Sequence, residues 1–332
     1  MDTHTNSDSY AIAFGDVQQA HARIRPYVVR TPLLESRTLN DLIGARVLAK
    51  AECLQNAGAF KFRGACNRLL QLTDAQRKAG VVAFSSGNHA LATSAVGRMF
   101  GVPATIIMPA DAPKAKIEGA RANGATVILY DREKDDREAI GADIARKTGA
   151  IIVPPYDDPH IMAGQGTAGI EIVEQAQAID APLDVVIAAS SGGGLVAGVA
   201  TAVKHLSPRT AVYAGEPAGF DELARSLVSG QPETNAPGTR SICDSLQVAK
   251  PGKLTFPINK RYLAGSLVVT DDEVRQAMKA AYQHLKLVVE PGGAVPLAAL
   301  LAGKLDVSGK TVAIVLSGGN VDASVFIEAL KG

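Results

Sequence analysis

The pattern that most constrains the fold is a unit that occurs three times: a strand-like run, a turn of small residues and a helix-like run. Strand and helix fall at 81–84 and 90–100, at 185–189 and 195–205, and at 311–316 and 321–330. Further strand patterns at 104–108, 126–130 and 151–153 alternate with helix patterns at 115–122 and 136–147. Such alternation predicts an α/β fold with open, mainly parallel sheets flanked by helices.

The chain is longer than a typical single domain, so we expect two lobes, each with its own core. The compact βαβ run predicts a small, mobile lobe over residues 80–157, inserted into a large lobe formed by 1–79 and 158–332. Because the small-residue turns follow the carboxyl ends of strands, where open α/β sheets bind ligands, we expect a site in the cleft between the lobes. Residues 229–239, rich in Gly, Pro and Asn, predict a surface loop.

Composition argues against several classes of function. The 34 Lys and Arg residues against 33 Asp and Glu give a net charge of +1, which offers no electrostatic basis for binding nucleic acid or an anionic membrane. No apolar run approaches the roughly 20 residues of a membrane-spanning helix, and residues 1–9 lack a secretory core, so we expect a cytoplasmic protein. The three cysteines (Cys53, Cys66 and Cys243) lack metal-ligand spacing and predict buried, reduced thiols.

Lys61 occupies a place where a lysine becomes nucleophilic. It lies between Phe60 and Phe62, after a strand-like run over 47–51 and at the start of a helix-like run over 63–72. The free N–H groups and the dipole of a helix start disfavour an ammonium group, and aromatic neighbours desolvate it, so both lower the pKa of the lysine. A neutral amine there can form a Schiff base with a carbonyl compound, with a solvated surface charge as the alternative.

The turn formed by Gly192, Gly193 and Gly194 is the candidate phosphate site. Glycine lets the backbone approach a ligand closely, and the helix that follows presents its N–H groups to an anion. The turn has neither the Gly-Lys-Ser/Thr of a Walker loop nor the Gly-x-Gly-x-x-Gly spacing of a dinucleotide site. A nucleophilic lysine and a phosphate cradle without a nucleotide motif indicate pyridoxal 5'-phosphate; a plain strand-to-helix turn is the alternative for the glycines.

Five segments resemble, in this order, the motifs of the threonine dehydratase and serine racemase family of pyridoxal-phosphate enzymes, which have fold type II. They are 59–65 (AFKFRGA), 85–89 (SSGNH), 163–167 (AGQGT), 191–195 (SGGGL) and 316–322 (LSGGNVD). The resemblance extends from about Thr31 to Lys331. Five motifs in order are far more specific than any one of them.

The resemblance implies a role for each matching residue. Lys61 carries the cofactor in a pocket that includes Phe60, Asn88 hydrogen-bonds the phenolic oxygen of the cofactor, and Ser317 faces its pyridine nitrogen. The large lobe holds the phosphate through Ser191, Gly192, Gly193, Gly194 and Leu195. The amino-acid substrate is bound by Ser85, Ser86, Asn88, His89 and Arg137.

The implied chemistry is dehydration and deamination of a 3-hydroxy amino acid to a 2-oxo acid and ammonia. The cofactor makes the Cα proton of the substrate acidic, and the freed amine of Lys61 can remove that proton. Because Ser317 is a neutral hydroxyl, the ring is a weaker electron sink, which favours elimination over transamination. Ser86, expected on the opposite face, could reprotonate Cα, so a racemase with side dehydratase activity stays open; Ser86 could instead cap the helix that follows.

Two further classes of protein are alternatives. A β-replacement synthase shares the cofactor chemistry, but its relatives usually carry a different lysine segment. A non-enzymatic amino-acid-binding regulator could keep this fold, yet it would have little need of a lysine at a desolvated helix start.

A separate group of residues resembles the divalent-cation site of the family. Glu216, the Phe220 carbonyl and Glu222 match its two carboxylates and backbone carbonyl, and oxygen ligands suit Mg²⁺ or Ca²⁺. The family usually has aspartate at the last position, so the choice between Glu222 and its neighbour Asp221 stays open. The alternative is an acidic helix start favoured by the helix dipole.

Arg137 bears on the choice of substrate. It matches a family position near the cleft, and a guanidinium can receive a distal carboxylate through two parallel hydrogen bonds. That would suit 3-hydroxyaspartate as well as serine or threonine, while a surface arginine on an exposed helix is the alternative. The segment 243–245 (CDS) and Leu91 depart from the usual family residues and make plain threonine deamination less secure. We also expect a homodimer.

Overall fold

The computed structural model describes residues 10–85, 87–112, 114–131 and 134–331. Its larger sheet contains β1 (Leu33–Glu35), β2 (Arg46–Lys50), β7 (Val185–Ala189), β8 (Ala211–Pro217), β9 (Gly265–Val269) and β10 (Thr311–Val315). The strand order is β1-β2-β10-β7-β8-β9, and neighbouring strands are parallel except that β1 runs antiparallel to β2.

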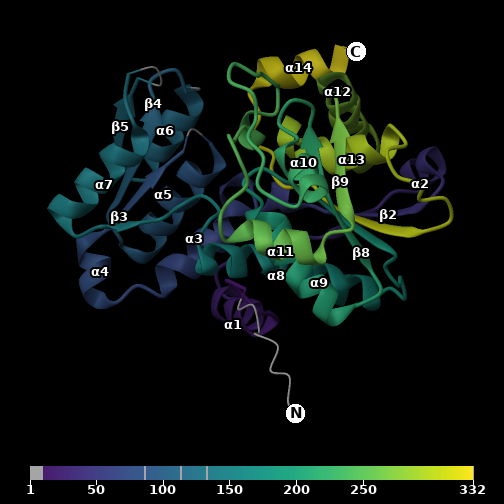
Figure 1. The fold of residues 1–332 in the computed structure, drawn as a ribbon, viewed down its shortest axis with the longest axis horizontal. Coiled ribbons are helices and arrows are strands. Elements are labelled where there is room, and N and C mark those ends of the chain that lie inside the picture. Colours follow the sequence, from purple (N-terminus) through teal and green to yellow (C-terminus); the bar gives the residue numbers. More distant parts are fainter. Residues whose placement is uncertain (1–9, 86, 113, 132–133, 332) are drawn as a thin grey trace.

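The smaller sheet is wholly parallel and lies within residues 81–152. Its order is β5-β4-β3-β6, formed by β3 (Val81–Phe84), β4 (Ala104–Pro109), β5 (Thr126–Tyr130) and β6 (Ile151–Ile152). Figure 1 shows this sheet beside the larger one, with helices around both. The predicted α/β fold with two mainly parallel, open sheets is therefore confirmed.

Helices cover both sheets (Figure 1). Those next to the smaller sheet are α4 (Asp74–Ala79), α5 (Asn88–Phe100), α6 (Lys114–Ala122) and α7 (Arg137–Thr148). The others are α1 (Phe14–Ile24), α2 (Arg37–Ile43), α3 (Lys61–Leu70), α8 (Pro159–Gln177), α9 (Gly194–Leu206), α10 (Glu222–Ser229), α11 (Thr255–Tyr262), α12 (Asp271–Ala280), α13 (Pro291–Leu301) and α14 (Ala323–Lys331). Short turns are η1 (Glu52–Leu54), η2 (Asn56–Gly58), η3 (Asp244–Leu246) and the π-helical η4 (Ala281–Leu285).

The larger sheet is buried on both faces, which explains why its strands read as continuous apolar runs. Alternate residues of β10 point to opposite sides: Val312 and Ile314 join a core with α12 and α13, whereas Ala313 and Val315 join a core with α8 and α9. Helices on both faces leave the carboxyl ends of the strands free to form a site.

A polar cap sets the start of α7, whereas two uncapped helices begin earlier than predicted. Asp136 accepts hydrogen bonds from Glu138 N and Ala139 N at the start of α7. By contrast, α3 and α5 begin two residues earlier than their apolar patterns indicate, at Lys61 and Asn88. A polar residue in the first turn adds nothing to an apolar period, so the pattern misses it.

Other features of the described chain agree with the sequence. The three cysteines are buried and free, as predicted. Within the described ranges, no helix is both long and apolar enough to span a membrane. Of the loop predicted over 229–239, residues 230–239 contain no helix or strand, whereas Ser229 ends α10 and Asn235 is buried.

Candidate active site

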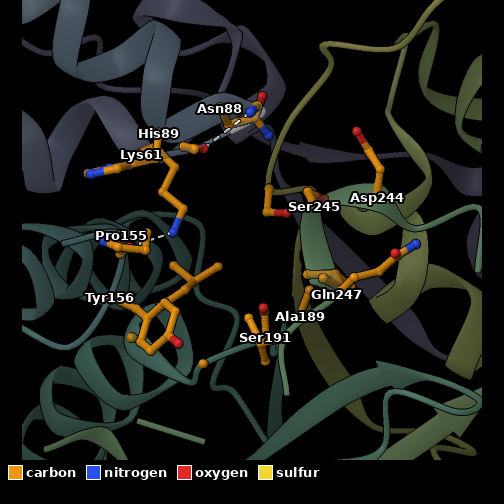
Figure 2. Close-up of a pocket in the computed structure, with 18 of the residues that line it drawn as sticks. Lys61, Asn88, His89, Pro155, Tyr156, Ala189, Ser191, Asp244, Ser245 and Gln247 are labelled. Atoms are coloured by element: carbon orange, nitrogen blue, oxygen red, sulfur yellow. Dashed lines mark hydrogen bonds between the residues drawn. The ribbon is translucent and has the colours of Figure 1, made fainter. Parts of the chain in front are cut away.

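The three small-residue turns meet at one pocket, as the carboxyl ends of parallel strands do. The lining includes most residues singled out from the sequence: Phe60, Lys61, Ser85, Asn88, His89, Arg137, Ser191, Gly192, Gly193, Gly194, Leu195 and Ser317. Ser86 lies outside the described residues. Figure 2 shows Lys61 reaching into the pocket from one side, with Asp244, Ser245 and Gln247 on the other. The structure thus brings the predicted residues together, while their individual roles remain predictions.

Lys61 is the first residue of α3, and its amine is held inside the pocket. Nζ donates a 2.6 Å hydrogen bond to the carbonyl of Pro155 (Figure 2). It also lies 5.1 Å from the ring centre of Phe60. Burial lowers the pKa of Lys61 to about 8, against an opposing effect of the Glu290 charge. Phe62, expected to desolvate the lysine as well, is buried in the core of the smaller sheet instead. Near pH 8, therefore, much more of the Lys61 amine is neutral than in an exposed lysine.

A network of buried charges lies behind this helix start. Arg63 donates to Glu52 Oε2 and Glu171 Oε2 at 2.8 Å each, and Lys50 donates to Glu171 Oε2 at 2.6 Å. All four side chains are at most 2% exposed. Through Arg63, which is two residues after Lys61, the network connects α3 to β2, η1 and α8.

The glycine turn after β7 has the form of an anion cradle. In the part of the chain that the structure describes, no acceptor is bonded to the backbone N–H groups of residues 191–196. Gly193 has φ of +88°, and a Cβ on Gly192 would collide with the ring of Tyr156. Thr255 Oγ donates a 2.6 Å hydrogen bond to Gly192 O and so holds the turn from outside. Free N–H groups at the start of α9 suit a phosphate.

Asn88 is held by Glu290, which the sequence did not single out, and by Asn320 of the 316–322 segment. Its Nδ2 donates to Glu290 Oε1 at 2.5 Å, and its Oδ1 accepts from Asn320 Nδ2 at 2.8 Å. Glu290 is 1% exposed, and burial raises its pKa to about 7. The only sequence signal for Glu290 is an acidic residue between the apolar run 287–289 and Pro291.

His89 is a neutral group on the wall of the pocket. Its Nε2 lies 2.8 Å from Val153 O, and burial lowers its pKa to about 3. Ser85 Oγ accepts from Gly87 N at 3.1 Å, which shapes the turn after β3. His89 can therefore position a substrate but carries no positive charge near neutral pH.

Of two cations on the smaller sheet's helices, Arg137 lines the pocket and Lys116 pairs with a residue of its lining. Arg137, the first residue of α7, lies over the ring of Phe84 at 5.5 Å and lines the pocket. Lys116 on α6 is 7% exposed and forms a 2.6 Å ion pair with Asp244 on η3, across the pocket from Lys61. The sequence did not indicate the Lys116–Asp244 pair, since the two residues are 128 positions apart.

The predicted cation ligands lie together at the end of β8, apart from the pocket lining. Glu216 accepts from Leu223 N, Ala224 N and Ser266 Oγ, while Glu222 Oε1 is buried with no partner among the described residues. Burial raises the pKa of Glu216 to about 7 and that of Glu222 to about 8. Asp221 instead faces Arg225 at 3.6 Å. In the described chain, no group of three or more His, Cys, Asp or Glu side chains could hold a metal.

The residues present fit pyridoxal phosphate. The unbonded N–H groups of the glycine turn suit its phosphate, and the Lys61 amine suits its aldehyde. Ser317, which is 4% exposed, lines the same pocket. These donors match the phosphate and the aldehyde of pyridoxal phosphate, so a nucleotide is not required to explain the glycine turn.

Comparison with known proteins agrees with this fit. The family model described as "Pyridoxal-phosphate dependent enzyme" matches residues 24–318. The chain is 43% identical to an L-threo-3-hydroxyaspartate ammonia-lyase from Pseudomonas sp, covering 96% of this chain and 99% of the relative. It is 41% identical to a serine racemase from Arabidopsis thaliana, covering 98% of each. The structure of maize serine racemase superposes with a TM-score of 0.90 at 37% identity, covering 97% of this chain and 98% of that one. The chain therefore belongs to the fold type II family of pyridoxal-phosphate-dependent enzymes that includes serine racemases and hydroxy-amino-acid ammonia-lyases.

Proposed function

We propose that the protein dehydrates and deaminates a 3-hydroxy amino acid, and that a 3-hydroxyaspartate fits best among such substrates. The observation that carries the proposal is the position of Arg137, which lines the same pocket as Lys61. Its guanidinium makes no hydrogen bond or ion pair with a described residue, so its donors are available for a distal carboxylate. The 43% identity to an L-threo-3-hydroxyaspartate ammonia-lyase supports the same substrate class.

The bound cofactor makes the Cα–H bond of an amino acid acidic by accepting its electron pair. Lys61 Nζ, with its lowered pKa, accepts the Cα proton. Arg137 and the turn after β3 orient the two ends of the substrate, with the neutral His89 adding no competing charge. The β-hydroxyl leaves as water after protonation, and hydrolysis of the resulting enamine yields a 2-oxo acid and ammonia.

A substrate panel tests this function. L-serine, D-serine, L-threonine and the isomers of 3-hydroxyaspartate should be assayed separately for 2-oxo acid and for enantiomer formation. The proposal expects the highest kcat/KM for formation of oxaloacetate from a 3-hydroxyaspartate. Faster enantiomer formation than 2-oxo acid formation from every substrate would instead identify a racemase.

We propose Glu216, the Phe220 carbonyl and Glu222 as a site for Mg²⁺ or Ca²⁺. The buried, unpartnered Glu222 Oε1 supports this, and so does the Phe220 carbonyl, which accepts no hydrogen bond from a described residue. Because Asp221 faces Arg225, Glu222 is the better ligand of the two acidic neighbours. Chelation tests the site, because removal of a bound metal should lower thermal stability.

We further propose that residues 80–157 move as a small lobe against the large one, and that the protein forms a homodimer. The separate smaller sheet supports the first point, and the Lys116–Asp244 pair would join the lobes when closed. The exposed side chains of Tyr282, Val325 and Ile327 near the C-terminal helix support the second. Substrate-dependent hydrogen exchange within 80–157 and sedimentation mass test the two points; unchanged exchange, or a monomer mass, would contradict them.

A further inference from the structure

Glu290 is a buried carboxyl group of the pocket to which no cation among the described residues is bonded. It immediately precedes Pro291 at the start of α13 and is 1% exposed. Oε1 accepts the hydrogen bond from Asn88, and Oε2 is buried without a partner among the described residues. A buried carboxyl left half satisfied costs free energy, so its presence in the pocket requires a reason.

The contacts around Glu290 hold the Asn88 amide in one orientation. Asn320 Nδ2 uses its two N–H groups for Ala57 O and Asn88 Oδ1, each at 2.8 Å, so Asn88 must present its carbonyl to Asn320. Of the two N–H groups on Asn88 Nδ2, one bonds to Glu290. The other is left for a ligand in the pocket.

The backbone makes room for this carboxyl group. Glu290 N donates a 3.0 Å hydrogen bond to Gly318 O, and a Cβ on Gly318 would collide with the Glu290 carboxyl. The glycine after Ser317 therefore allows Glu290 to lie against Asn88.

Charges from three other elements act on Glu290. Lys61 on α3 and Lys116 on α6 favour its ionised form, whereas Asp244 on η3 and burial disfavour it. The nearby thiols of Cys53 and Cys243 stay neutral, because burial raises the pKa of each to about 12. Glu290 in turn raises the pKa of Lys61, against the larger effect of burial.

We propose that Glu290 is a positioning residue for the cofactor: it orients the Asn88 amide toward the phenolic oxygen, and its ionised form, in the pocket that it shares with Lys61, favours a proton on the Lys61 nitrogen. The proposal depends on the family's cofactor and not on the proposed substrate, so the substrate panel and the experiment below fail separately.

The test is a spectrophotometric pH titration of the bound cofactor together with its dissociation constant. Glu290→Gln keeps the size and the acceptor oxygen but removes the charge, so the midpoint of the absorbance change should fall by about one pH unit. Glu290→Asp keeps the charge but withdraws the oxygens from Asn88. The freed amide should then raise the dissociation constant of the cofactor by about tenfold, the equivalent of one lost hydrogen bond.

Asp244→Asn is the matched control, because Asp244 also lines the pocket but its side chain is 47% exposed and paired with Lys116. Screening by solvent should limit its effect on the midpoint to about 0.3 pH unit or less. A wild-type midpoint in folded Glu290→Gln would overturn the proposal. Should that variant fail to fold, a wild-type cofactor affinity in Glu290→Asp would overturn it as well.

Discussion

Replacing Arg137 by alanine should reduce kcat/KM for a 3-hydroxyaspartate far more than for serine. The guanidinium lies over Phe84 and pairs with no described acidic residue, so a distal carboxylate would be its partner. A hydrogen bond to a charged group contributes about 1.5 to 3 kcal/mol. With 1.36 kcal/mol for each factor of ten, the expected loss is roughly 10- to 150-fold.

Loss of the contact between Arg137 and Phe84 should lower kcat/KM by the same factor for every substrate. An exposed cation–π pair contributes about 0.5 to 1 kcal/mol, and its removal affects all substrates alike. Serine has no second carboxylate, so its kcat/KM should change by less than about threefold to fivefold.

The kcat/KM values for 3-hydroxyaspartate and serine can be measured under the same conditions by coupling the release of the 2-oxo acid to oxidation of NADH. Arg137→Lys is the matched variant, since it keeps the charge but loses the planar fork, and its loss should be intermediate. Equal losses on 3-hydroxyaspartate and serine would refute the reasoning, because Arg137 would then support the lobe and not the substrate.

Three further results are expected. Lys61→Ala should abolish turnover and the cofactor absorption at roughly 410 to 420 nm together; retained activity would exclude Lys61 as the attachment residue. Glu171→Ala should lower the free energy of unfolding by about 3 to 5 kcal/mol in urea denaturation, because it leaves Arg63 and Lys50 without part of their buried counter-charge; a loss below about 1 kcal/mol would contradict this account. The pKa values of Glu216 and Glu222 are raised in the folded chain from 4.5 to about 7 and about 8, so the folded state binds more protons than the unfolded one in that range. In chelator, thermal stability should therefore fall as the pH rises from about 4.5 to 8, Mg²⁺ or Ca²⁺ should restore it, and Glu216→Ala should remove the response to metal. Identical melting curves with and without chelator would exclude the site.

Much of the site was accessible from short segments of the chain. Lys61, Asn88 and the glycine turn each lie at a strand-to-helix junction, and the residues of such a junction are neighbours in sequence. For the lysine at a helix start and the glycines before a helix, the residue types carry the signal directly, whereas the role expected of Asn88 followed from the family resemblance. The alternation of strands and helices predicted both sheets for the same reason, since each element is formed by local periodicity.

By itself, then, the sequence determined the α/β fold, the family resemblance and the residues expected to hold the cofactor. Only the tertiary structure decided that Glu290 holds Asn88, that Lys116 pairs with Asp244 and that Arg137 lines the pocket. Asn88 and Glu290 are 202 positions apart, and Asn88 and Asn320 are 232 apart. No periodicity extends over such distances. Contacts of this kind arise when two separately formed sheets bring their strand ends to one pocket, and burial there sets the pKa values of Lys61 and Glu290.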